Sequence, residues 1–93
     1  MATIRQEMIL LLSEAAHSAR DLSQALRIPE KDVYDHLSHI SRSVVPNRQK
    51  LLIVPSRCLS CLYVFTNRRR YTRPSRCPKC RSERIEEPTY RIT

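Results

Sequence analysis

The stretch RCLSC at residues 57–61 is matched by RCPKC at residues 76–80, with residues 62–76 between the two cysteine pairs. In each pair, two residues separate the cysteines. Such a turn lets two thiolates reach one ion at about 2.3 Å, and two turns complete the tetrahedral four-thiolate set of a structural zinc. The sequence therefore predicts one zinc ion held by Cys58, Cys61, Cys77 and Cys80.

The same cysteines leave two alternatives open, a rubredoxin-type iron centre and a pair of disulfides. Disulfides persist in oxidising compartments. The longest apolar run, residues 8–12, is too short for a signal-peptide core or a membrane span. We therefore expect a cytoplasmic protein with no membrane partner. A chain of 93 residues also builds only a thin core, which a metal that binds on folding can supplement.

Residues 3–15 are expected to form a helix, with Thr3 and Gln6 as a capping box. Its apolar stripe consists of Ile4, Met8, Leu11, Leu12 and Ala15. Successive residues step by about 100° around a helix, so Leu10 and Ile9 leave the core face. Two explanations remain open: the strands or the C-terminal tail cover them, or the first helix forms a homodimer contact.

Two further helices and two strands are expected after the first helix. Ser18 is the predicted N-cap of a second helix, which Pro29 ends. The third helix covers roughly residues 30–43, with Val33, Leu37, Ile40 and Val44 facing inward. Residues 51–54 are predicted to form a strand, and residues 84–87 and 90–92 a returning strand that Pro88 either breaks or confines to an edge of the sheet.

This order predicts an α+β fold, a winged helix-turn-helix with three helices and a small antiparallel sheet. The four-cysteine ribbon would be inserted as an enlarged wing. The expected divisions are a core at residues 1–55, a zinc ribbon at residues 56–83 and a returning strand at residues 84–93. Many small helical cores share the helix pattern, so a purely structural role for the helices is the alternative.

In a winged helix-turn-helix, the second helix of the pair enters the major groove of DNA. Here that is the third helix. Its expected contacts to bases and phosphates are Lys31, Tyr34, Asp35, Ser38, His39 and Arg42. Asp35 would repel phosphate, so it is expected either to accept from cytosine N4 or to pair with Lys31 or His39.

The net charge of +8 is concentrated in the second half of the chain. Residues 56–82 contain eight arginines and lysines and no carboxylate. We expect Arg68, Arg69 and Arg70 at the tip of a mobile projection, and these three with Arg73 as contacts to double-stranded DNA. A short strand with Tyr63 and Phe65 on one face is expected to lead into it. A loop kept soluble by its charge, or arginines that compensate the thiolates, are the alternatives.

A second function remains open, that of a zinc-ribbon adaptor docking onto a protein or ribonucleoprotein complex through the same basic tip. An enzyme is not expected, because protein ligands fill all four metal positions. No nucleophile with a partner acid or base is evident, nor is a small-molecule substrate.

Four blocks of the sequence resemble a family of small prokaryotic, especially archaeal, predicted transcriptional regulators. The blocks are DVYDHL at residues 32–37, LLIVP at 51–55, PSRCPKC at 74–80 and SERIEEP at 82–88. In that family, a winged helix-turn-helix carries a rubredoxin-like zinc ribbon in place of the wing. The resemblance covers nearly the whole chain and implies zinc and DNA binding.

The chain departs from such proteins in having no glycine. Leu62 and Arg81 follow the cysteine pairs where zinc knuckles commonly use glycine to reach positive φ, and Arg27 occupies the turn between the second and third helices. Each is expected to cost on the order of 1 kcal/mol. Pro29 stands where a serine N-cap is usual.

Overall fold

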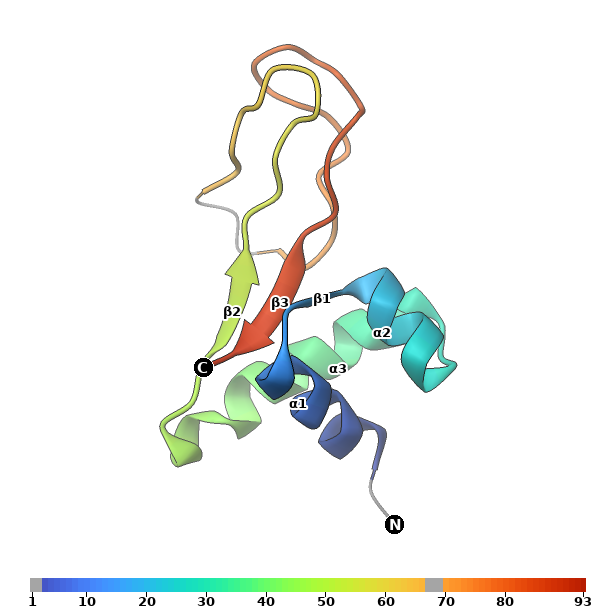
Figure 1. Cartoon of the computed structure of the whole chain (residues 1–93), viewed down its shortest axis with the longest axis vertical. Coiled ribbons are helices and arrows are strands. Elements are labelled where there is room, and N and C mark those ends of the chain that lie inside the picture. The colour runs from blue at the N-terminus through green and yellow to red at the C-terminus, as the bar shows by residue number, and fades with distance from the viewer. Residues whose placement is uncertain (1–2, 67–69) are drawn as a thin grey trace.

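The computed structural model describes residues 3–66 and 70–93 (Figure 1). Within them, three α-helices, one short 3-10 helix and three strands follow one another. In chain order these are α1 (Ile4–Glu14), β1 (His17–Ser18), α2 (Ala19–Leu26), α3 (Glu30–Ser43), η1 (Val45–Asn47), β2 (Leu51–Val54) and β3 (Thr89–Ile92). No helix in this described part has both the length and the apolar composition needed to cross a membrane.

The strands form one antiparallel sheet in the order β1-β3-β2. Residues of β2 pair with β3 from Leu51 opposite Ile92 to Val54 opposite Thr89. On the other side of β3, His17 pairs with Tyr90. The sequence prediction placed strands at residues 51–54, around Tyr63 and Phe65, and at residues 84–87 and 90–92. It missed β1, because two residues between two helices carry no period-2 pattern.

Side-chain caps begin the first two helices as predicted. The Thr3 hydroxyl accepts from the Gln6 backbone N–H, and the Gln6 side chain accepts from the Thr3 N–H at 2.9 Å. Ser18 and Asp21 form the equivalent box at the start of α2. Helix α3 starts after Pro29 with no side-chain cap, also as expected.

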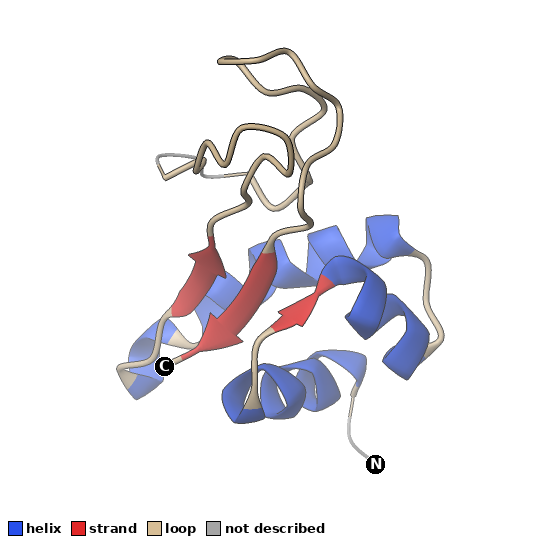
Figure 2. Ribbon diagram, turned by 45° about the horizontal axis from the view of Figure 1, so that its top comes forward, coloured by secondary structure: helices blue, strands red, loops and turns tan. Residues whose placement is uncertain are grey.

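The helices bury their apolar faces against one side of the sheet (Figure 2). The buried core consists of Met8, Leu12, Ala19, Leu22, Val33, Leu37, Ile40, Val44, Tyr90 and Ile92. The inward face predicted for α3 is confirmed in full. In α1 the predicted burial of Ile4 and Ala15 is wrong: both are exposed, because they lie at the first turn and at the C-cap, beyond the part of α1 that meets the core.

The cysteine-bearing segment lies between β2 and β3 and extends the molecule along its longest dimension of 46 Å (Figure 1). Regular strand structure is scarcer here than predicted. At Tyr63 and Phe65 the expected strand reduces to one bridge between Val64 and Arg57, and at residues 84–87 to one bridge between Ile85 and Cys58. Backbone hydrogen bonds flank both bridges, from the Cys58 N–H to the Tyr63 carbonyl and from the Glu86 N–H to the Arg57 carbonyl.

The segment after the gap in the described residues folds back onto the helical core. The Tyr71 ring packs edge to face against the buried Tyr90 ring, with 5.9 Å between centroids. The Tyr90 hydroxyl donates to the Tyr71 carbonyl. Tyr71 therefore packs against the core, a contact that the sequence prediction, which described only the tip at residues 68–70, did not include. A single tyrosine in a basic run gave no sign of this contact.

Candidate metal centre and basic surface

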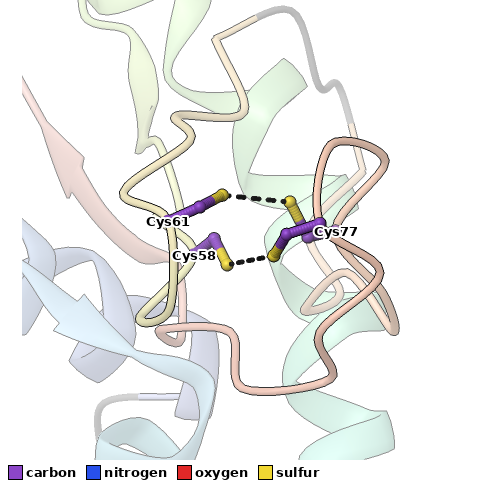
Figure 3. A group of neighbouring side chains, drawn as sticks. Cys58, Cys61 and Cys77 are labelled. Atoms are coloured by element: carbon purple, nitrogen blue, oxygen red, sulfur yellow. Dashed lines mark hydrogen bonds between the residues drawn. The ribbon is translucent and has the colours of Figure 1, made fainter.

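The four cysteine sulfurs converge at one point of the ribbon. The Sγ atoms of Cys58 and Cys80 are 3.5 Å apart, those of Cys61 and Cys77 are 3.6 Å apart, and all four lie within 4.8 Å of one another. Cys58, Cys61 and Cys77 point toward one another in Figure 3. Sulfurs about 2.3 Å from a tetrahedral zinc would be about 3.8 Å apart. The donor set therefore fits one tetrahedral ion, and all four cysteines are free thiols.

Two turns with the same backbone pattern supply the sulfurs. In the first, the Leu62 N–H donates to the Cys58 carbonyl at 2.9 Å; in the second, the Arg81 N–H donates to the Cys77 carbonyl at 2.9 Å. Leu62 and Arg81 have φ of 66° and 63°. The departure predicted from the lack of glycine is confirmed at both positions, and also at Arg27 with φ of 57°.

A small second core supports the site. Cys58, Cys77 and Ile85 are buried, with Phe65 packed against them. The Ser60 and Ser82 hydroxyls lie 3.0 Å apart and join the two knuckles. The Leu59 N–H donates to the Arg84 carbonyl at 2.8 Å, which ties the first knuckle to the returning segment.

The pKa values of the four thiols show that the site needs a cation before all four sulfurs can be thiolates. The backbone N–H of Cys61 has the largest influence on Cys58 and lowers the pKa of its thiol to about 6. At Cys80 the Ser82 N–H favours the thiolate, but burial and the three neighbouring sulfurs outweigh it and raise the pKa to about 12. Sulfurs this close cannot all be negative alone. A divalent ion deprotonates such thiols outright.

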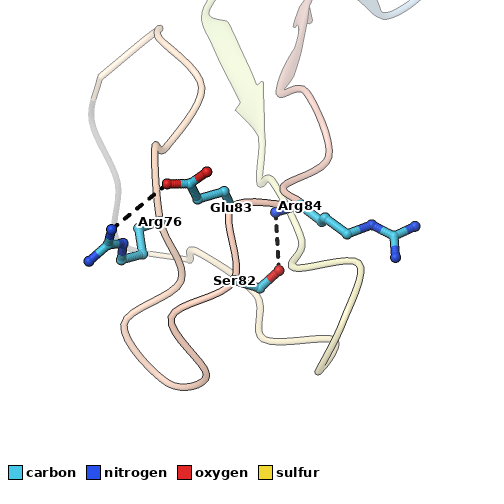
Figure 4. A network of polar contacts seen from close by, with 4 residues as sticks. All are labelled: Arg76, Ser82, Glu83 and Arg84. Carbon is cyan, nitrogen blue, oxygen red and sulfur yellow. Dashed lines mark hydrogen bonds and ion pairs between the residues drawn. The ribbon is translucent and has the colours of Figure 1, made fainter.

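Two arginines of the ribbon form ion pairs with carboxylates that lie outside the basic run. Arg57 pairs with Glu86 at 3.5 Å, and Arg76 pairs with Glu83 at 3.8 Å (Figure 4). The sequence prediction counted all eight cations of residues 56–82 together and missed these partners. The signal was present, because the three glutamates of the second half directly follow the last cysteine.

The predicted contacts on α3 fall into two groups. Lys31, Asp35, His39 and Arg42 are exposed, and Ser38 is half-buried beside them. Tyr34 is different: it is half-buried, packs against the core and lines a pocket with Arg73. Asp35 forms no ion pair with another described residue.

The predicted arginines of the ribbon are only partly placed. Arg70 and Arg73 are exposed. Arg68 and Arg69 lie outside the described residues. The sequence prediction of DNA contacts at these four positions stays a prediction.

The chain was compared with known families and structures. A family model described as "PF0610-like, N-terminal" matches residues 3–53, more than half of the chain. The chain belongs to this PF0610-like family. A second model, described as the PF0610 rubredoxin-like zinc beta-ribbon domain, matches residues 55–93. The two matches together span both the helical core and the cysteine-bearing segment.

A solved structure supports the same assignment. The chain is similar to protein PF0610 from Pyrococcus furiosus, solved by solution NMR, with 35% identity and a TM-score of 0.79 over 97% of this chain and 88% of that one. A comparison with proteins of curated function finds no match. As a PF0610-like chain with a zinc ribbon, it has a metal site for which zinc is the fitting ion.

Proposed function

We propose that this PF0610-like protein is a DNA-binding transcriptional regulator in which α3 enters the major groove. The observation that carries the proposal is the two-sided character of α3. One face is fully buried through Val33, Leu37 and Ile40, while the opposite face exposes Lys31 and Arg42. A recognition helix needs both properties at once, since the core must hold it while polar side chains reach the bases.

The order of elements supports a winged helix-turn-helix. Helices α2 and α3 are joined by a tight turn at residues 27–29, and α1 packs beside them. The strands β2 and β3 then form the hairpin from which a wing extends. In this protein the zinc ribbon would take the place of that wing (Figure 1).

The charge distribution supports a backbone contact by the ribbon. Arg70, Arg73, Lys79 and Arg81 are exposed and form no ion pair with another described residue. Such side chains neutralise phosphates without reading sequence. The ribbon would then supply affinity and α3 would supply specificity.

The test is a titration of zinc-loaded protein against duplexes selected from genomic fragments, read by fluorescence anisotropy across a salt series. If about six phosphates are neutralised, log affinity should fall with log salt at a slope of about −5. No duplex binding at about 10 μM protein in low salt would refute the proposal, because even non-specific binding is usually detectable there.

Paired variants locate the contact. Lys31→Ala with Arg42→Ala should weaken binding to the selected duplex at least tenfold and reduce its preference over random sequence. Arg91→Ala removes an exposed charge from β3, whose neighbours Tyr90 and Ile92 face the core, and should leave the preference unchanged. Equal effects of the two changes would argue against α3 as the recognition element.

A second candidate is a zinc-ribbon adaptor that docks onto a protein or ribonucleoprotein complex. Exposed apolar side chains favour it: Leu59, Leu62 and Val64 on the ribbon, and Leu52 and Val54 on β2. The adaptor predicts that Leu62→Gln disrupts partner binding while Lys31→Ala does not. DNA binding as proposed above predicts the opposite ranking.

A further inference from the structure

A pocket of about 280 Å³ lies where the ribbon folds back onto the helices. Residues at the start of α2 and in the first turns of α3 form one side, and residues 72–73 and 87–88 form the other. The pocket thus has one wall in the helical core and one wall in the ribbon insertion and its returning segment. Anything bound in it would contact both parts of the molecule.

Four charged side chains line this pocket, Arg20 and Arg73 with Glu30 and Glu87. Among the described residues, none of these four side chains forms an ion pair or a side-chain hydrogen bond. The ion pairs of the described residues involve Arg57 and Arg76 instead. Two cations and two carboxylates give the lining no net charge. A lone phosphate or a lone metal ion would meet repulsion as well as attraction there.

Tyr34 adds a neutral hydrogen-bonding group to the same pocket. Burial raises the pKa of its hydroxyl, Glu30 and Glu87 raise it further, and Arg73 opposes them. Both carboxylates therefore lie near the phenol although they come from different segments of the chain. The hydroxyl stays protonated near neutral pH and can donate to a carboxylate.

The rest of the lining sets the size and character of a ligand. Ala19 and Pro88 provide apolar surface, and the buried Tyr90 also lines the pocket. A volume of about 280 Å³ is at the small end of ligand pockets, which run from roughly 300 to 1,000 Å³. A dinucleotide or other large cofactor is too big, whereas a molecule of amino-acid size fits.

We propose that this pocket binds a small zwitterion of the α-amino-acid class. Its carboxylate would lie against the arginines and Tyr34, its ammonium group against the glutamates, and its side chain against Ala19 and Pro88. Because the ligand would bridge α3 and the ribbon, it would change the affinity for DNA. That last consequence rests on the proposed DNA-binding function, while ligand binding itself does not.

The test uses the full, zinc-loaded, isotope-labelled chain without DNA. Each common amino acid except cysteine and histidine, which would compete for the zinc, is added to 10 mM or to its solubility limit, and amide shifts are followed by NMR. We expect at least one amino acid to give saturable shifts at residues 19–20, 30–34, 72–73 and 87. Its methyl ester lacks the carboxylate and its N-acetyl derivative lacks the ammonium group, so each should bind at least tenfold more weakly.

Two pocket variants and one control complete the experiment. Glu87→Gln and Arg73→Gln should each weaken binding at least tenfold, with the spectrum of the free protein reporting an intact fold. Arg76→Gln changes an arginine of the ribbon that pairs with Glu83 outside the pocket, and it should leave binding unchanged.

Three results would overturn the zwitterion site: no amino acid gives saturable shifts at these amides, both derivatives bind as well as the parent, or both pocket variants bind like the wild type. A bound amino acid that leaves the duplex affinity unchanged would overturn the coupling. Because the binding is measured without DNA, failure of the DNA-binding proposal is seen separately, as absence of duplex binding.

Discussion

At the scale of single residues, the most informative positions are those with positive φ that lack glycine. Leu62 has φ of 66° in the first zinc knuckle and is 65% exposed, so its side chain contributes little packing. A left-handed conformation costs a non-glycine residue roughly 1–2 kcal/mol, which a glycine would not pay. Glycine instead loses roughly 0.5–1 kcal/mol, because its unfolded chain has more conformational entropy to give up. The balance favours glycine.

We therefore predict that Leu62→Gly raises the stability of the zinc-loaded protein by roughly 0.5–1 kcal/mol. The melting temperature at fixed zinc concentration should rise by a few degrees. Leu59 is the matched control, because it lies in the same knuckle, is 52% exposed and has no positive φ. Leu59→Gly should lower the melting temperature, and a fall with both substitutions would contradict the strain assigned to Leu62.

Tyr34 gives a prediction about alkaline pH. Its pKa is raised from 10.0 in the folded protein, mainly by burial and then by Glu30 and Glu87. The folded state therefore binds the phenol proton more tightly than the unfolded state does. This contribution to stability is fully present below about pH 10 and is lost as the pH rises through the folded pKa.

The measurement compares urea unfolding of the wild type and Tyr34→Phe between pH 8 and pH 11. The difference in unfolding free energy should shift in favour of Tyr34→Phe as the pH rises past 10, because phenylalanine has no proton to lose. A difference that stays constant over this range would show that the folded environment does not raise the pKa of Tyr34.

At the scale of the elements, the sequence was most predictive where one local rule decides the structure. Capping boxes at Thr3 and Ser18 and the apolar spacing from Val33 to Val44 predicted the helices. The cysteine spacing likewise predicted the four ligands of the metal site. Each of these patterns is local in the chain: a capping box covers four residues, the apolar spacing twelve and the two cysteine pairs twenty-three.

Elements that depend on distant partners were not predictable in the same way. Strand β1 exists because His17 and Ser18 meet β3, more than seventy residues later in the chain. Tyr71 folds back because Tyr90 offers it a ring and a hydroxyl donor. Neither contact produces a periodic pattern of residues at its own position, so neither could be expected from the sequence.

The zinc ribbon is the element whose stability should depend most on the metal. Among the described residues, its small hydrophobic cluster has Cys58, Cys77 and Ile85 as buried members, so the coordination bonds must provide most of the order. We predict that chelation unfolds the ribbon, seen as loss of dispersed amide signals from residues 56–66 and 70–82. The helices, which have their own core, should keep their circular dichroism signal.

Cys58→Ser tests the ligand set directly. Removal of one thiolate should weaken zinc binding, measured by competition with a chromophoric chelator, by more than the roughly 10–100-fold that loss of an outer partner causes. Ser60→Ala in the same knuckle removes only the exposed hydroxyl that meets Ser82, so it should weaken zinc binding by less than about tenfold. Equal zinc affinities of Cys58→Ser and the wild type would exclude Cys58 as a ligand. Metal analysis that finds about one iron per purified chain would identify the bound metal as iron and not zinc.

At the scale of the whole molecule, α1 bears on the oligomeric state. Leu10 is 61% exposed and lines a groove between α1 and α2 with Leu11, Ala25 and Leu26. The groove is mainly apolar, and Glu7 and Glu14 also line it. We propose that this surface forms a symmetric homodimer contact, in which the same patch meets itself across a two-fold axis. Two half-sites of DNA could then be read by the two α3 helices.

Light scattering after size exclusion tests the dimer. The wild type should be dimeric at about 100 μM, within the range of a modest apolar interface, and Leu10→Gln should be monomeric. Val45→Gln is the control, since Val45 is 62% exposed but lies on η1. A monomeric wild type would contradict the dimer. Equal loss of the dimer in both variants would contradict a contact at Leu10.

The most direct test of the account is photo-crosslinking to a selected duplex. A photoreactive residue replaces His39, which is exposed on α3, or Arg91, which is exposed on β3. If α3 lies in the major groove, position 39 should crosslink to bases within the selected site, and position 91 should crosslink little or not at all. Efficient crosslinking from position 91 with none from position 39 would contradict the assignment of α3 as the recognition helix.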